Sequence, residues 1–254
     1  MPAEPMKPLA GKVALVTGAV RRIGRAIALR LVDDGAAVVI HARSSADEAR
    51  ALADEIGRRG GTSMIALANV TDEAAVRGMV EQVDARFGRL DVLVNNAAMR
   101  AQVPFLEMSL AQWREITGII LDGAFIVTQA CLPLMLRGGE GGRIVNIGGA
   151  TAYIGALERA HVVTAKAGLG GFTRALAMEF ADRGITVNCV VPGRIGGQRS
   201  KTAGAEPPPG GHDPIVGRLG EPDDVAAIVR PLWLSTGRYV TGQTIHVNGG
   251  LYMT

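Results

Sequence analysis

The chain is poor in cysteine, in aromatic residues and in net charge. Of its 254 residues only Cys131 and Cys189 are cysteines, and each lies in an apolar run, so both are expected to be reduced core residues. Aromatic residues make up 4% of the chain. A net charge of +3 is too small and too scattered to indicate nucleic-acid binding.

Long hydrophobic runs are also missing. Because no stretch of about 18 apolar residues occurs, no membrane span is expected. Residues 1–10 contain three prolines and no apolar core, which excludes a signal peptide and predicts a loose leader. These absences favour a soluble, cytoplasmic protein.

Glycine and apolar residues are abundant instead. The chain has 34 glycines and 48% hydrophobic residues, which is typical of a compact protein with many tight turns. Its length suffices for one large α/β domain, and neither internal repeats nor a linker interrupt it. We therefore treat residues 1–254 as a single domain.

A strand, a tight turn and a helix start follow one another near the beginning of the chain. Val13–Val16 is an apolar run typical of a buried parallel strand. Gly18 and Gly24 allow a sharp turn, and a helix from about Ile23 directs its free N–H groups at a ligand. A helix N-terminus favours an anion, so this unit predicts a pyrophosphate site. A plain strand-to-helix turn is the alternative.

Arginines flank this turn and the end of the next strand. Arg22 stands where such turns usually carry a glycine, and we expect it to contact phosphate, the alternative being a solvated side chain. After a strand at 36–40 come Arg43 and Ser44, and no acidic residue is nearby. An acidic residue there would bind the ribose of NAD, whereas arginine accommodates the 2′-phosphate of NADP. NADP(H) is therefore expected, unless Arg43 is an ordinary surface arginine.

The β-α rhythm continues along the chain. Strands are expected at 64–68, 90–94, 143–147, 186–191 and 244–247, with a helix over 160–181. A long helical region over 110–136 should be bent or interrupted by Pro133. Asn69, Asn95 and Ala97 follow strands and suit contact with adenine, ribose and nicotinamide. Residues 196–218, rich in Gly and Pro, are expected to form a substrate-side lid.

These pieces together resemble the short-chain dehydrogenase/reductase (SDR) family over nearly the whole chain. The resemblance rests on Thr17-Gly18 to Gly24, Asn95-Asn96-Ala97, Lys166, Pro192-Gly193 and Val247-Asn248-Gly249-Gly250, and Arg22 is similar to the pteridine reductase branch. It implies a doubly wound, seven-stranded parallel Rossmann sheet, an NAD(P) cofactor, a small-molecule substrate and a homotetramer. The residues expected to contact NADP(H) are Thr17, Gly18, Arg22, Ile23, Gly24, Arg43, Ser44, Asn69, Val70, Asn95, Ala97, Lys166, Pro192, Gly193 and Ile195.

The catalytic set that the family implies is largely missing. Lys166 is present, but the positions of the catalytic Tyr, Ser and Asn hold Val162, Gly149 and Ile120. None of these can transfer a proton, and general acid–base help contributes about 10²–10⁴-fold in rate. Gly196 and Gly197 also stand where the family often has a phosphate-contacting Thr. The standard mechanism should therefore be badly impaired.

Three nearby side chains are candidate substitutes. His161 is the first candidate for the replacement acid. It lies one residue before the position of the missing tyrosine, so its side chain points about 100° away from that position around the helix. Tyr153 and Glu158, expected in the loop before that helix, are the others and would line the substrate pocket with Val162. We expect an NADP(H)-dependent oxidoreductase acting on a carbonyl or alcohol. A lyase, hydrolase or isomerase on the same scaffold, or a non-catalytic NADP(H)-binding protein, are the alternatives.

Overall fold

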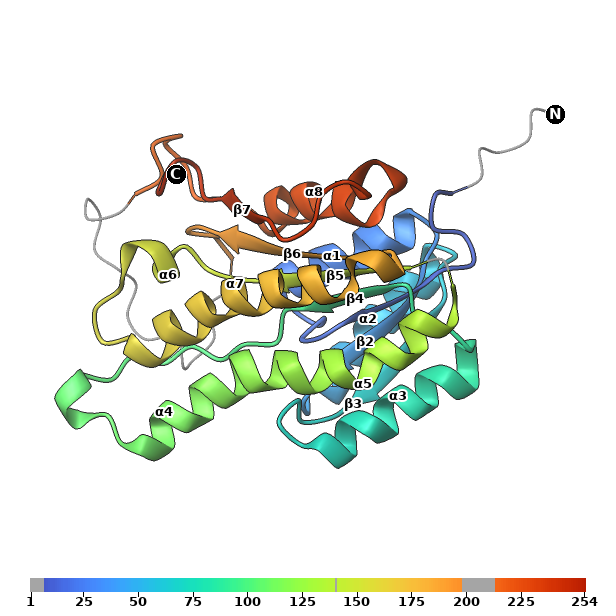
Figure 1. The fold of residues 1–254 in the computed structure, drawn as a ribbon, viewed down its shortest axis with the longest axis horizontal. Helices are drawn as coiled ribbons and strands as arrows, with labels where there is room; N and C mark the ends of the chain where they lie inside the picture. The colour runs from blue at the N-terminus through green and yellow to red at the C-terminus, as the bar shows by residue number, and fades with distance from the viewer. Residues whose placement is uncertain (1–6, 140, 198–212) are drawn as a thin grey trace.

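The computed structural model describes residues 7–139, 141–197 and 213–254, and its centre is a parallel sheet of seven strands (Figure 1). The strand order is β3-β2-β1-β4-β5-β6-β7, so the chain reverses its direction across the sheet between β1 and β4. This confirms the predicted single-domain, doubly wound Rossmann fold. In such sheets ligands bind outside the carboxyl ends of the strands at the reversal point. The strands are β1 (Val13–Val16), β2 (Ala37–Ala42), β3 (Ser63–Leu67), β4 (Val92–Asn95), β5 (Gly142–Ile147), β6 (Ile185–Pro192) and β7 (Thr244–Val247).

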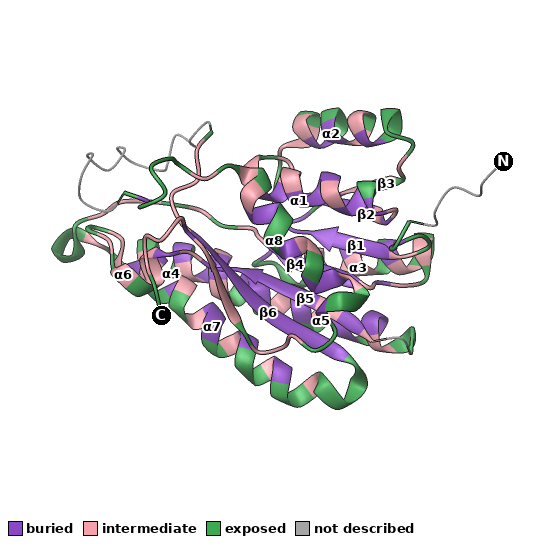
Figure 2. Cartoon of the chain, turned by 90° about the horizontal axis from the view of Figure 1, so that it is seen from above, coloured by how far each residue is buried: buried purple, intermediate pink, exposed green. Residues whose placement is uncertain are grey.

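Helices cover both faces of the sheet, and the strands are the most buried part of the molecule (Figure 2). Successive residues of β1 alternate between two cores: Ala14 and Val16 pack under one helical layer, Val13 and Leu15 under the other. The first layer contains α1 (Arg22–Asp33), α2 (Ala46–Arg58) and α8 (Pro222–Trp233). The second contains α3 (Glu73–Phe87), α5 (Gly123–Arg137) and α7 (Ala160–Phe180).

A buried carboxylate joins α1 to α8. Asp34, just after α1, accepts hydrogen bonds from Nε and Nη2 of Arg230 at 2.9 and 2.6 Å. It also accepts one from the indole Nε1 of Trp233 at 2.9 Å. Because Asp34 is only 4% exposed, these bonds satisfy a charge that burial would otherwise make costly.

The long helical region is interrupted, but not at the predicted residue. Pro133 lies inside α5 without ending it, so the predicted interruption at this residue is wrong. The irregularity is instead a π-helical turn, η2 (Gly118–Asp122), between α4 (Leu110–Thr117) and α5. It lies where Gly123 packs against Val70: a Cβ on Gly123 would come within 2.7 Å of the Val70 side chain.

The same stretch, Leu110–Arg137, is long and apolar enough to cross a membrane by length and composition. Half of its most apolar 18-residue window is buried within the fold, and α5 packs against α3 and the sheet. It therefore has the character of a core helix.

Other boundaries differ by a few residues. β2 extends through His41 to Ala42, and Tyr153 lies in a one-turn helix, α6 (Thr151–Ile154), rather than in a loop. Two short helical turns, η1 (Phe105–Glu107) and η3 (Ala181–Arg183), precede α4 and follow α7, and η4 (Ser235–Gly237) follows α8. Residues 198–212 of the predicted lid and residues 1–6 of the predicted leader lie outside the described residues.

Candidate active site

The turn after β1 depends on two glycines. Gly18 has a φ of +62°, which side-chain-bearing residues rarely adopt. A Cβ on Gly24 would come within 2.3 Å of the Gly18 carbonyl oxygen and 2.6 Å of Asn96 Nδ2. Only glycine at position 24 allows α1 to begin this close to the end of β1.

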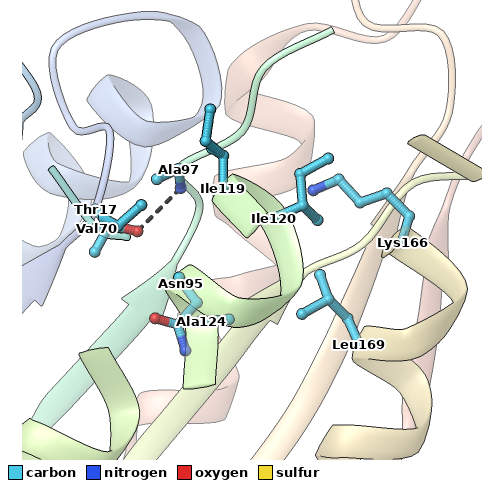
Figure 3. A pocket seen from close by; sticks show the side chains of 10 residues that line it. Thr17, Val70, Asn95, Ala97, Ile119, Ile120, Ala124, Lys166 and Leu169 are labelled. Atoms are coloured by element: carbon cyan, nitrogen blue, oxygen red, sulfur yellow. Dashed lines mark hydrogen bonds between the residues drawn. The ribbon is translucent and has the colours of Figure 1, made fainter. Parts of the chain in front are cut away.

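Thr17 and Asn96 fix this turn to the end of β4. Thr17 Oγ1 accepts hydrogen bonds from the backbone N–H groups of Asn96 and Ala97 at 2.9 and 3.0 Å, the second of which is drawn in Figure 3. The Asn96 side chain donates to the carbonyl oxygens of Thr17 and Gly18. The Thr17 hydroxyl therefore holds the glycine turn against the end of β4, because its hydrogen bonds are made to the protein backbone.

His41 supports the turn from the other side. Its Nδ1 accepts a hydrogen bond from the Gly18 N–H at 3.2 Å, and its Nε2 lies 3.0 Å from the Ala68 carbonyl oxygen. These partners require the neutral ring with the proton on Nε2. Burial lowers the pKa of His41, against a smaller opposing effect of the Ala68 carbonyl.

The first turn of α1 offers unused backbone donors. Its N-cap residue, Arg21, makes no side-chain capping bond and no acidic residue lies in the first turn. By contrast α3 is capped by Asp72 and α4 by Ser109. Free N–H groups at a helix N-terminus bind phosphate well, so these residues fit the pyrophosphate of a dinucleotide.

Arg22 has a backbone conformation usually left to glycine, with a φ of +50°. Its guanidinium donates from Nη2 to the Ile195 carbonyl oxygen at 2.7 Å and from Nη1 to the Gly197 carbonyl oxygen at 3.1 Å. This geometry differs from both expectations for Arg22, because the guanidinium neither lies free in solvent nor is directed only at a phosphate. Arg22 connects the glycine turn to the segment that follows β6.

The predicted ribose-side residues lie at the ends of their strands. Arg43 and Ser44 are exposed just beyond β2, and no hydrogen bond or ion pair of Arg43 is seen in the described part of the chain. Asn69 is exposed, and its Oδ1 accepts from the Thr71 N–H at 3.3 Å, which leaves its amide nitrogen available. Arg43 is therefore free to bind an anionic group at this edge.

Asn95 and the residues after β6 serve the framework as well. Asn95 Nδ2 donates to Thr128 Oγ1 and Asn146 Oδ1, both at 2.9 Å, and Asn146 in turn donates to Thr173. Asn95 Oδ1 is buried without a partner among the described residues. At the end of β6, the Pro192 carbonyl oxygen accepts from the Ala150 N–H, and a Cβ on Gly193 would come within 2.6 Å of Asn248 Cα.

A small cavity lies between the glycine turn and α7 (Figure 3). Lys166 enters it from α7, opposite Ile120 of η2, with Leu169 below. The Lys166 Nζ donates to the Ile147 carbonyl oxygen at 2.5 Å. The lining residues are Thr17, Val70, Asn95, Ala97, Ile119, Ile120, Gly123, Ala124, Lys166 and Leu169.

The surroundings of Lys166 favour its neutral form. Burial, and then the positive charge of Arg100, lower the pKa of Lys166 to about 8, with a small opposing effect of Cys189. Burial raises the pKa of the Cys189 thiol to about 11, so this cysteine is not an acid near neutral pH. The pKa of Lys166 therefore lies closer to neutral pH than that of an ordinary lysine.

The three replaced catalytic positions gather around Lys166. A Cβ on Gly149 would lie 3.8 Å from Lys166 Cγ, and Val162 precedes Lys166 by one helical turn. Val162, Ile120 and Ala150 belong to one apolar cluster. The side chains at the predicted positions of the missing Tyr and Asn are therefore in an apolar environment.

None of the three candidate substitutes lines this cavity. His161 is fully buried, both ring nitrogens lack partners among the described residues, and burial lowers its pKa. Tyr153 stacks with His246 and Tyr252 at centroid distances of 4.6 and 5.2 Å. Glu158 is exposed, with a φ of +58°. A catalytic role for any of them stays a prediction.

Three residues contribute to the site in ways that the sequence did not predict. Asn96 and His41 fix the glycine turn through bonds that only the folded chain forms. Arg100 acts on Lys166 across space from the loop after β4. Asn96 belongs to a sequence motif, whereas the bonds of His41 and the effect of Arg100 on Lys166 depend on contacts that the sequence does not show.

Comparisons with known proteins point the same way as the geometry. A family model described as enoyl-(acyl carrier protein) reductase matches residues 18–252. The chain is similar to the 3-oxoacyl-[acyl-carrier-protein] reductase FabG of Staphylococcus aureus, with 40% identity over 243 residues, 95% of this chain and 98% of the relative. The FabG proteins of Aquifex aeolicus and Escherichia coli are each 39% identical over 96% of this chain and 98% of their own length.

Proposed function

Since the chain belongs to the short-chain dehydrogenase/reductase family, a family of oxidoreductases, we propose that it is an NADP(H)-dependent enzyme that reduces a small carbonyl substrate without a catalytic tyrosine. One observation carries this proposal. The glycine turn, the uncapped start of α1 and the exposed Arg43 suit a dinucleotide, whereas Ile120, Gly149 and Val162 place groups near Lys166 that cannot transfer a proton.

Cofactor choice rests on the end of β2. Arg43 and Ser44 are exposed there, and an arginine at this place accommodates the 2′-phosphate of NADP. The free N–H groups of α1 would hold the pyrophosphate, and Asn69 and Val70 would lie along the adenine side. The Arg22 guanidinium, which donates to the carbonyl oxygens of Ile195 and Gly197, would hold the segment after β6 beside the phosphates.

The substrate is inferred from the walls of the site. The bacterial relatives are named for reducing 3-oxoacyl groups, and the apolar cluster around Val162 suits an aliphatic neighbour of a ketone. We therefore expect a small ketone or aldehyde with an apolar substituent rather than a highly hydroxylated compound.

Calorimetric titration with NADPH and NADH tests cofactor choice. Arg43→Ala should weaken NADPH binding roughly tenfold to a hundredfold, because a charge-assisted hydrogen bond contributes about 1.5–3 kcal/mol, and should leave NADH binding nearly unchanged. Arg58→Ala, at an exposed arginine of the last turn of α2, is the matched control. Equal losses for both cofactors would contradict the assignment of Arg43.

A screen of ketones and aldehydes, followed by the loss of NADPH absorbance, tests the reaction. The apolar replacements favour one second candidate, a protein that binds NADP(H) and does not turn over. Tight NADPH binding without turnover of any carbonyl in the screen would select that candidate.

The cellular location and the oligomeric state are proposed from the family and from the surface of α7. A soluble cytoplasmic homo-oligomer is supported by the family and by small, exposed residues along α7, among them Ala167, Gly171 and Ala175. Small residues let helices of neighbouring subunits approach closely, and the family expectation is a tetramer.

A further inference from the structure

We propose that the Lys166 ammonium itself gives the proton to the substrate oxygen, taking over the step for which the family uses a tyrosine. This inference rests on the proposed carbonyl reduction and names the acid of that reaction. In the family's scheme the lysine acts through the tyrosine; here it acts directly.

Lys166 is the one ionisable side chain among the residues that line the cavity of the described chain. The other lining side chains are aliphatic, except for Thr17 and the Asn95 amide, which are held by internal hydrogen bonds. A carbonyl oxygen that enters this space therefore meets no other acid.

The geometry leaves Lys166 donors to spare. One N–H of its ammonium is used by the Ile147 carbonyl oxygen, and an ammonium has three. No bulky side chain separates Lys166 from the position one turn earlier, where Val162 is short and apolar, or from Gly149, which has no side chain. Neither position therefore offers the substrate oxygen a proton donor that would compete with Lys166.

The charges around Lys166 suit an acid that works near neutral pH. Burial and Arg100 both disfavour the ammonium, Cys189 on β6 weakly favours it, and together they place the pKa of Lys166 at about 8. At pH 7 the ammonium still predominates. A proton donor is most effective when its pKa lies near the working pH.

The chemistry balances within one turnover. Reduced nicotinamide supplies a hydride to the carbonyl carbon when it is bound. The π electron pair of the carbonyl moves to oxygen, an N–H bond of Lys166 breaks, and an O–H bond forms. The electron pair of that N–H bond stays on Nζ as a neutral amine, which a proton from water then restores.

The test combines a measurement on the cofactor-free protein with kinetics. The chain has only four lysines, so ¹³C-lysine labelling gives few Cε resonances, and Lys166→Arg assigns one of them. We expect that resonance to titrate near pH 8. In the wild type, kcat/KM for reduction should fall above the same pH.

Lys166→Arg keeps a positive charge but has no accessible proton to release, because a guanidinium stays protonated far above neutral pH. At saturating NADPH it should lose roughly a hundredfold or more in kcat and lose the pH limb. Lys166→Met is neutral and similar in length, and it should show the same loss in kcat. This variant tests the proposal even if the larger arginine side chain does not fit at position 166.

The outcomes separate the two proposals. Carbonyl reduction that persists in both Lys166 variants with an unchanged pH limb overturns the role of Lys166 and leaves the proposed function standing. A Cε resonance of Lys166 that titrates above about pH 10, the ordinary range of lysine, also overturns it. Complete absence of turnover in the wild type overturns the proposed function, and this inference with it.

Discussion

Restoring the missing tyrosine and serine should convert the site into an efficient carbonyl reductase. The perturbation is Val162→Tyr combined with Gly149→Ser. Val162 and Lys166 are one turn apart on α7, so the new hydroxyl should lie near the Lys166 ammonium, which lowers the pKa of a phenol. A serine side chain fits at 149, because its Cβ would make only ordinary contacts at 3.8 Å with Lys166 and Thr151.

The magnitude follows from two opposing effects. Val162 is 7% exposed within an apolar cluster, so the larger ring should cost about 1–3 kcal/mol of folding free energy through overpacking. General acid catalysis contributes about 10²–10⁴ in rate, which is roughly 2.7–5.4 kcal/mol of activation free energy, and this is the upper limit of the gain because Lys166 already serves as a proton donor in the wild type. The activity should therefore rise even if the melting temperature falls.

The assay is NADPH-dependent reduction of the carbonyl panel, with thermal unfolding measured alongside. Val162→Phe with Gly149→Ser is the matched control, since it differs from the test variant by one hydroxyl. A folded tyrosine variant that binds NADPH but is no faster than the phenylalanine control would refute the reasoning. It would show that position 162 does not face the reacting group.

Three further expectations concern the framework. Because burial keeps His41 neutral in the fold, the free energy of unfolding should decrease as the pH falls below 6.5, where the unfolded chain takes up the proton, and should level off below the lowered pKa of His41. The slope is at most about 1.4 kcal/mol per pH unit, and urea titrations should find a smaller slope in His41→Gln. Asp34→Ala should cost roughly 2–4 kcal/mol, because it leaves the Trp233 N–H buried without a partner while Arg230 keeps some water contact; a loss below about 1 kcal/mol in the same titrations would contradict this. Light scattering should give a mass well above the 26.5 kDa of one chain, and a value near 26.5 kDa would exclude the homo-oligomer.

Most of the fold was predictable because the signals are local. Apolar runs such as Val13–Val16 identify buried strands without knowledge of their neighbours, and the glycines at 18 and 24 identify the turn between strand and helix. The predicted ends of strands were wrong where contacts with residues distant in the sequence determine them. β2 continues to Ala42 because His41 and Ala42 pair with Ala66 and Leu67 of β3, and this pairing cannot be read from the β2 sequence itself.

The site was predictable in its positions and not in its electrostatics. The resemblance to the family, with the spacing of its catalytic set, identified Ile120, Gly149, Val162 and Lys166, and the structure brings these positions together. The lowered pKa of Lys166 depends on how deeply the side chain is buried and on Arg100, which follows a different strand. Such effects exist only in the folded molecule.

The π-helical turn at Gly118–Asp122 sets the rotational phase of everything that follows it in α5. One residue more or fewer turns a helix by about 100°, so regularising this turn would rotate Val127 and Cys131, both fully buried, away from the sheet. Insertions and deletions in this stretch are therefore constrained by the core, whatever happens to the chemistry. Core packing alone is enough to retain the π-helical turn, which places residue 120 at the cavity. The turn therefore does not depend on a polar side chain at position 120.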